Sequence, residues 1–139
     1  TNSQGTASQA QSMGGMMGTM RDYQKRVRLW TADCFGDEVD LDRPTRQAQM
    51  LEDALECAQA AGMPFATAQS LLELVYSKPA GDLSAEVGDV MTSFAAFCTA
   101  HGADLHDCAE AALTRCVAET DRIREKQNAK PFHKKIKAA

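Results

Sequence analysis

The chain has 139 residues, of which 44% are hydrophobic and 24% are charged, and its 19 acidic and 15 basic side chains give a formal net charge of −4. This composition is ordinary for one soluble globular domain. No apolar run approaches the roughly 20 residues that a membrane span needs, and no signal peptide opens the chain, so we expect a cytoplasmic protein without a membrane partner.

Residues 1–20 contain no Lys, Arg, Asp or Glu and many Gly, Ser, Gln and Met. They show no hydrophobic period, so we expect a disordered leader there. An all-α domain is predicted over residues 21–128, followed by a basic flexible tail over residues 129–139.

The predicted helices follow one another through short connections. The first covers residues 21–35 and ends at Gly36. After the loop DEVDLDRP, Pro44 suits the first turn of a second helix that reaches about Ala61.

Gly62 and Pro64 separate this helix from a short third one over FATAQSLLELVYS. Ser84 is the predicted N-cap of a fourth helix, and Asp104 is the predicted N-cap of a long last helix over residues 105–126. No strand-like alternation is visible, so the predicted fold is an all-α antiparallel bundle of four to five helices. Because these helices are short and rich in Ala, one copy buries little surface, and we expect a homodimer or a homotetramer.

The five cysteines form no C-x-x-C pair, and their odd number argues against a closed disulfide framework. Most of them lie among small apolar residues of predicted helices, so we expect buried, reduced thiols. A thiol nucleophile would need a histidine partner, and the sequence does not assign one to any cysteine.

Two sets of acids lie at helical spacing. Glu52, Asp53 and Glu56 belong to the second predicted helix, and Glu86 and Asp89 belong to the fourth. Residues three or four apart are neighbours on a helix, where like charges repel by roughly 0.2–0.5 kcal/mol per pair. Both sets border an apolar stripe, so packing the two helices side by side would bring at least four carboxylates into one cleft.

A divalent cation would remove the repulsion in such a cleft, and Mg²⁺ prefers hard oxygen ligands. Acids on a helix are also typical of a solvated face, and the spacing alone leaves both interpretations open. The chain has an acidic middle and basic ends. The basic ends could neutralise the acidic middle within the chain. They could also lie beside a metal site in the acidic middle and bind phosphates there.

The motifs Glu52-Asp53-x-x-Glu56 and Glu86-x-x-Asp89 resemble the signature of the MazG-like all-α nucleoside triphosphate pyrophosphohydrolases, which is normally written E-E-x-x-E and E-x-x-D. The segments VRLWTADCFG, LEDALECAQAAGM, EVGDVMTSFAAFCTAHGADL and RIREKQNAKP extend the resemblance to short stand-alone members over residues 21–133. The resemblance implies hydrolysis of a (d)NTP to the monophosphate and pyrophosphate in nucleotide-pool house-cleaning. It also implies Mg²⁺ as the cofactor, with Mn²⁺ as a substitute.

By this resemblance, Asp53, Glu56, Glu86 and Asp89 bind the metal. Glu52 and Glu56 are the catalytic candidates, with Glu52 either a further ligand or the group that orients the attacking water. Asp53 stands where the family usually has Glu, and its shorter reach implies a difference in the position or the number of the metal ions. The gap between the two motifs is also at the long end for the family.

Arg122, Lys126 and Lys130 are candidates for phosphate contacts, with a solvated helix end as the other interpretation. Trp30 is a candidate for stacking on the base, although a lone Trp on an apolar helix face is more often a core residue. The three histidines show no ligand spacing. The segment KPFHKK lacks the interleaved aromatics of a nucleic-acid site, so we expect no nucleic-acid partner.

Two other functions fit the same residues. One is a non-catalytic helical interaction module whose acids form a structural cation site. The other is a pyrophosphohydrolase of a different nucleotide, such as phosphoribosyl-ATP. No pattern in the sequence identifies the base or distinguishes ribose from deoxyribose.

Overall fold

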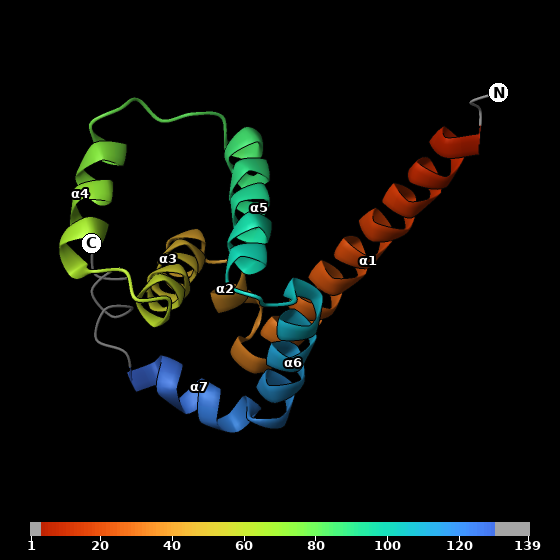
Figure 1. Ribbon diagram of the computed structural model, residues 1–139. Helices are drawn as coiled ribbons and strands as arrows, with labels where there is room; N and C mark the ends of the chain where they lie inside the picture. The colour runs from red at the N-terminus through yellow and green to blue at the C-terminus, as the bar shows by residue number, and fades with distance from the viewer. Residues whose placement is uncertain (1–3, 130–139) are drawn as a thin grey trace. The chain divides into compact units, whose positions relative to one another are not determined.

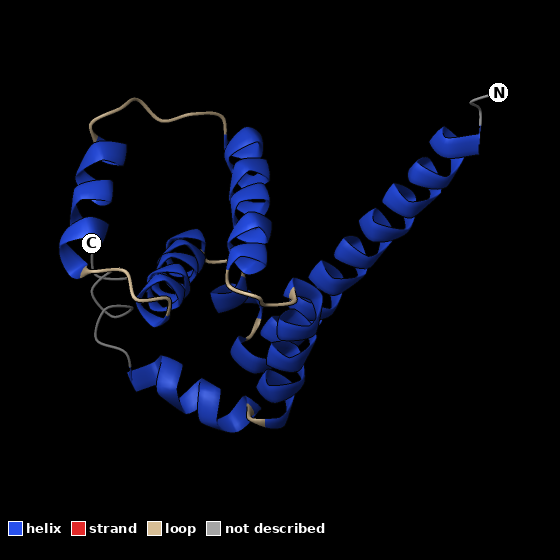
Figure 2. Cartoon of the chain, in the orientation of Figure 1, coloured by secondary structure: helices blue, strands red, loops and turns tan. Residues whose placement is uncertain are grey.

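The computed structural model describes the backbone of residues 4–129 and the side chains of residues 20–38 and 41–129. Over this range the chain forms seven α-helices and no strand, which confirms the predicted all-α class (Figures 1 and 2). The helices are α1 (Gln4–Phe35), α2 (Asp37–Asp40), α3 (Arg43–Ala60), α4 (Phe65–Tyr76), α5 (Leu83–Ala100), α6 (Leu105–Ala118) and α7 (Thr120–Ala129). Among these helices, none is both long enough and apolar enough to cross a membrane.

The chain divides into two units, and each is described by itself. The first unit comprises residues 1–43 and 116–139, and it contains α1, α2, the end of α6 and α7. The second unit comprises residues 44–115, and it contains α3, α4, α5 and most of α6. Helix α7 continues to Ala129, and the rest of the basic tail predicted over residues 129–139 lies outside the described residues.

Helix α1 begins much earlier than the sequence predicts. It runs without a break from Gln4 to Phe35, so the segment expected to be a disordered leader is helical from Gln4 onward. Adding residues to an existing helix costs far less than nucleating one, so the segment extends α1 even though four of its residues are glycines, which are poor helix formers. The predicted end is confirmed, because Gly36 has a φ of 78° and its N–H donates to the Ala32 carbonyl over 2.9 Å.

The predicted loop DEVDLDRP contains a short helix, α2, whose acidic residues suit a helix N-terminus. Helix α3 begins at Arg43 with Pro44 in its first turn, as predicted. It ends in a turn where the Met63 N–H donates to the Ala58 carbonyl over 3.0 Å. Gly62 has a φ of 89° in this turn, which confirms its predicted role after the end of the helix.

Helix α5 has a different N-cap from the predicted one. It begins at Leu83, and its N-cap is Asp82, not Ser84. The Asp82 carboxylate accepts a hydrogen bond from the Ala85 N–H over 3.0 Å. Asp and Ser cap helices about equally well. Asp82 is the N-cap because the loop before α5 leaves its backbone extended, with φ −77° and ψ 127°.

The long last helix of the prediction is two helices, α6 and α7. Its start is confirmed, since Asp104 accepts a hydrogen bond from the Asp107 N–H over 2.8 Å. The break accompanies Thr120, whose hydroxyl donates to the Val117 carbonyl over 2.8 Å. A threonine hydroxyl that bonds to a carbonyl of the preceding turn competes with the helical hydrogen bonds and bends the chain.

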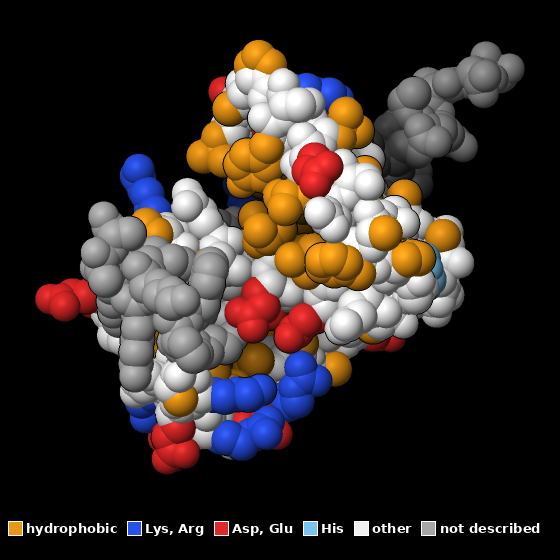
Figure 3. All heavy atoms as spheres, turned by 90° about the vertical axis from the view of Figure 1, so that its left-hand side faces the viewer, with side chains coloured by type: hydrophobic (Ala, Val, Ile, Leu, Met, Phe, Trp, Pro, Cys, Tyr) orange, Lys and Arg blue, Asp and Glu red, His pale blue; other side chains and the backbone are white. Residues whose placement is uncertain are grey.

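Few hydrophobic side chains are buried in the described residues. The buried ones are Cys34, Cys98 and Leu113. In the second unit, almost every side chain of α4 is exposed, and so is every side chain of α5 from residue 83 to residue 96. Figure 3 shows many hydrophobic side chains at the molecular surface. The apolar stripes of α4 and α5 are thus left uncovered, and the antiparallel bundle remains a prediction.

Replacing Asp82 by Ala should lower the free energy of unfolding by about 1 kcal/mol, because the Ala85 N–H then loses its acceptor at the start of α5. Urea unfolding followed by far-ultraviolet circular dichroism measures the change. Ser84→Ala is the matched control and should change the free energy by less than about 0.5 kcal/mol. Equal losses in the two variants would contradict the assignment of the cap to Asp82.

Candidate functional site

The first acid set lies on α3. Glu52 and Glu56 are one turn apart, and Asp53 is three residues before Glu56, so all three lie on adjoining parts of the helix surface. Asp53 and Glu56 are exposed and Glu52 is half-buried. The Asp53 carboxylate accepts a hydrogen bond from the Gln49 amide nitrogen over 2.9 Å. The predicted helical placement of this motif is therefore confirmed.

The second acid set lies in the N-terminal half of α5. Glu86 and Asp89 are three residues apart and both are exposed. Glu86 is in the first turn, where the partial positive charge of the helix N-terminus favours a carboxylate. Its carboxylate folds back over Gly81, so closely that a Cβ built on Gly81 would overlap one of its oxygens.

The structure does not gather these acids around a common point. Within the described residues, no three Asp, Glu, His or Cys side chains lie together closely enough to hold a metal ion. The donor set still fits Mg²⁺ in its chemistry, because it consists of carboxylates carried by two helices of one unit. Metal binding by Asp53, Glu56, Glu86 and Asp89 remains a prediction.

The candidate phosphate-binding residues belong to the other unit. Arg122 forms an ion pair with Glu119, and Lys126 is an exposed residue in the last turn of α7. Lys130 lies outside the described residues. Their contact with phosphates remains a prediction. The Arg122 guanidinium is already paired with the Glu119 carboxylate.

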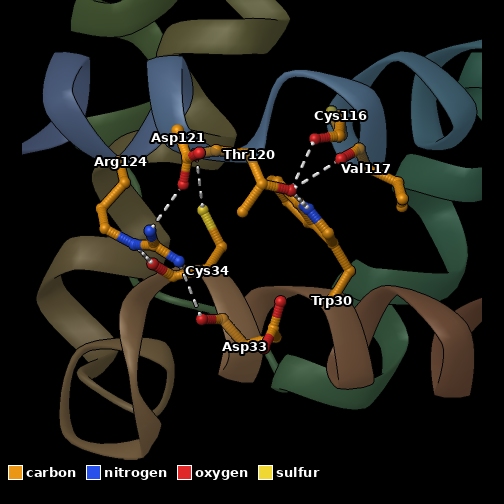
Figure 4. A network of polar contacts seen from close by, with 8 residues as sticks. All are labelled: Trp30, Asp33, Cys34, Cys116, Val117, Thr120, Asp121 and Arg124. Atoms are coloured by element: carbon orange, nitrogen blue, oxygen red, sulfur yellow. Dashed lines mark hydrogen bonds and ion pairs between the residues drawn. The ribbon is translucent and has the colours of Figure 1, made fainter.

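Trp30 takes part in the packing of α1 against α7 (Figure 4). Its indole N–H donates to the Thr120 hydroxyl over 3.1 Å, and its ring meets Phe35 edge-on with 5.8 Å between centroids. A half-buried Trp whose N–H has a protein partner is the usual picture of a packing residue. This geometry supports the core interpretation of Trp30 over base stacking.

Arg124 on α7 holds the C-terminal end of α1, a contact that the sequence did not reveal (Figure 4). Its guanidinium donates to the Cys34 carbonyl over 2.6 Å and to the Asp33 carbonyl over 3.3 Å. The last carbonyls of a helix have no partner within the helix, so a cation placed there satisfies them. Asp121 orients the guanidinium through a 3.0 Å ion pair.

Cys34 is the most buried cysteine of the described residues, with 1% of its surface exposed. Its thiol donates to the Thr120 carbonyl over 3.6 Å. Burial raises the pKa of the Cys34 thiol, and the nearby guanidinium of Arg124 opposes this rise only in part. A neutral, enclosed thiol is a poor nucleophile, so Cys34 is a structural residue.

A hollow of about 290 Å³ lies beside this contact, lined by the end of α1 and the last turns of α7. Its cationic group is the Arg124 guanidinium, which already bonds to the α1 carbonyls and to Asp121. The helix end contributes carbonyl oxygens, which repel anions. The hollow therefore does not resemble a phosphate site.

Comparison with known proteins leaves the family open: no family model, no curated protein and no solved structure matches the chain.

Replacing Arg124 by Ala should lower the free energy of unfolding by about 1–2 kcal/mol, because two carbonyls at the end of α1 lose their donor. We expect a smaller loss than for hydrogen bonds from a fully buried charged group, because the Arg124 side chain is 42% exposed. Arg122→Ala is the control, since its partner Glu119 lies on the same stretch of chain and the pair is solvated. Urea unfolding of the control should differ from the parent by no more than about 0.5 kcal/mol.

Iodoacetamide should modify Cys108 first and Cys34 last at about pH 8, because the raised pKa leaves Cys34 with a smaller thiolate fraction and burial restricts access. Peptide mass spectrometry over a time course gives the order of the five thiols. Labelling of Cys34 as fast as the exposed Cys108 would contradict the enclosed packing of α1 against α7.

Proposed function

We propose that this chain is a Mg²⁺-dependent nucleoside triphosphate pyrophosphohydrolase of the MazG-like all-α type, which converts a (d)NTP to the monophosphate and pyrophosphate. The observation that carries the proposal is the pair of acid motifs at helical spacing on α3 and α5 of one unit. Each motif borders the apolar stripe of its helix, so covering those stripes would bring the two motifs toward the same interior. House-cleaning of the nucleotide pool is the role that this activity suggests.

The proposed roles follow from the chemistry of the side chains. Asp53, Glu56, Glu86 and Asp89 would hold Mg²⁺, which when bound neutralises charge on the phosphates. Glu52 would position the attacking water or complete the ligand set, with Glu56 one turn away on the same face. Arg122, Lys126 and Lys130 would then be the residues available to contact the outer phosphates.

A phosphoryl transfer to water needs no nucleophilic side chain. The enclosed thiol of Cys34, which is a poor nucleophile, is consistent with this. The enclosed thiol has a raised pKa and no histidine among its hydrogen-bond partners. Positioning and charge neutralisation are the main requirements of this chemistry, and rigid helices supply positioning. The acids are therefore the groups on which the proposed activity depends.

A non-catalytic helical interaction module is the second candidate function. One observation favours it: the apolar stripes of α4 and α5 are exposed. In this case the acids would form a structural cation site or a solvated face. A pyrophosphohydrolase of another nucleotide, such as phosphoribosyl-ATP, would use the same acids and differ only in the nucleotide pocket.

A panel of NTPs and dNTPs with Mg²⁺ tests the proposal by scoring release of pyrophosphate against orthophosphate. We expect pyrophosphate from at least one nucleotide, and a loss of at least about a hundredfold in kcat/KM for Glu86→Gln and for Asp89→Asn. Glu73→Gln is the matched control, because Glu73 is an exposed acid of α4 outside both motifs. Its rate should equal that of the parent.

Each other result of the panel points to a different function. No product from any nucleotide, with helicity and melting unchanged by Mg²⁺, would favour the interaction module. Orthophosphate as the sole product would assign a different phosphatase chemistry. Pyrophosphate release that survives in both Glu86→Gln and Asp89→Asn would remove the second motif from the site.

A further inference from the structure

Gln49 donates a hydrogen bond to one of the acids that are proposed to bind the metal. Its side-chain amide lies one turn before Asp53 on α3 and donates to Asp53 Oδ1 over 2.9 Å. Gln49 is half-buried and Asp53 is exposed. Because both residues belong to one helix, the contact is set by α3 itself and not by the packing of other helices.

The bond contributes little to the stability of α3. Hydrogen bonds between glutamine and an acid four residues apart on a helix surface stabilise the helix only weakly. A pair of the same kind, Gln69 with Glu73, lies on α4 at 3.3 Å, outside both acid motifs. The main effect of the Gln49 bond is therefore on orientation, since it holds the Asp53 carboxylate in one direction.

The donor is a neutral amide, and this suits a carboxylate that is to bind a cation. A Lys or Arg partner would offset the charge of the carboxylate and compete with a metal ion for it. The Gln49 amide orients the Asp53 carboxylate and leaves its negative charge in place. Carboxylates that bind metals are themselves hydrogen-bonded, and the groups that orient them affect the affinity for the metal.

Asp53 depends on its direction more than the other acids of its motif do. Its side chain is shorter than those of Glu52 and Glu56, so it can reach a cation from fewer positions. The Gln49 amide engages one oxygen of the carboxylate, Oδ1. The other oxygen, Oδ2, is then the one presented to a cation.

We propose that Gln49 is a positioning residue of the metal site, an inference that rests on the metal site of the proposed function. By holding Asp53 Oδ1, its amide restricts Asp53 to binding a cation through one oxygen. Mg²⁺ is small and requires strict octahedral geometry, which one oxygen from each carboxylate satisfies. Ca²⁺ is larger and accepts both oxygens of a carboxylate. Gln49 therefore favours Mg²⁺ over Ca²⁺ at this site.

The test is cation binding by the full chain, measured without nucleotide. The electron paramagnetic resonance signal of free Mn²⁺ gives the Mn²⁺ dissociation constant, and displacement of Mn²⁺ gives those of Mg²⁺ and Ca²⁺. Gln49→Met removes the amide and keeps the length of the side chain. It should weaken Mg²⁺ binding at least about threefold, less than the roughly 10–100-fold typical of groups that orient metal ligands, because Gln49 is only half-buried.

The ratio of Mg²⁺ to Ca²⁺ affinity distinguishes orientation of Asp53 from a general structural effect. Without the amide, both carboxylate oxygens are available to Ca²⁺, so the ratio should fall at least about threefold in Gln49→Met. Gln69→Met is the matched control, because it removes the same kind of bond from Glu73 on α4. All three dissociation constants of this control should equal those of the parent. Circular dichroism establishes that both variants keep their helices.

Three results overturn the inference. The first is an equal loss of Mg²⁺ and Ca²⁺ affinity in Gln49→Met, up to the loss of both. The second is a set of affinities in Gln49→Met that matches the parent or the Gln69→Met control. The third is a parent chain that binds none of the three cations, whatever its activity.

The pyrophosphate assay on the same samples separates this inference from the proposed function. Cation binding that depends on Gln49 as expected, without pyrophosphate release from any nucleotide, retains the positioning role and removes the enzymatic proposal. Pyrophosphate release with the same ratio of Mg²⁺ to Ca²⁺ affinity in the parent and in Gln49→Met does the reverse.

Discussion

An amphipathic helix is stable in water when its apolar stripe is covered, and this requirement governs the whole second unit. The stripes of α4 and α5 are complete in sequence and in helical geometry, yet the described residues of one chain leave them exposed. The acid motifs border stripes of this kind on α3 and α5. In the proposed metal site, whatever covers these stripes would also set the distance between the two acid sets.

The first unit is held together in a different way. Its described contacts between α1 and α7 are specific and polar: the Trp30 indole with Thr120, and the Arg124 guanidinium with the last carbonyls of α1. Such contacts fix the register of two helices because each requires a particular pair of atoms. A few directional hydrogen bonds therefore fix how α1 and α7 pack, and the buried Cys34 lies among them.

Local features of this fold could be predicted from the sequence, because they depend on neighbouring residues. Gly36 and Gly62 end their helices as expected, and the spacing of the acids places each motif on one helix. Features that depend on distant residues could not be predicted. The contacts of Trp30 with Thr120 and of Arg124 with Cys34 join positions 90 residues apart. The relation between the acids of α3 and α5 likewise depends on packing that no local pattern encodes.

Gly81 ties the direction of one acid to a residue outside its helix. The Glu86 carboxylate occupies the space that a side chain at position 81 would fill, so a larger residue there would displace it. Because Glu86 is a flexible and exposed side chain, it can move aside at little cost and stay in the first turn of α5. The absence of a side chain at position 81 thus leaves room for the Glu86 carboxylate to fold back over the linker before α5.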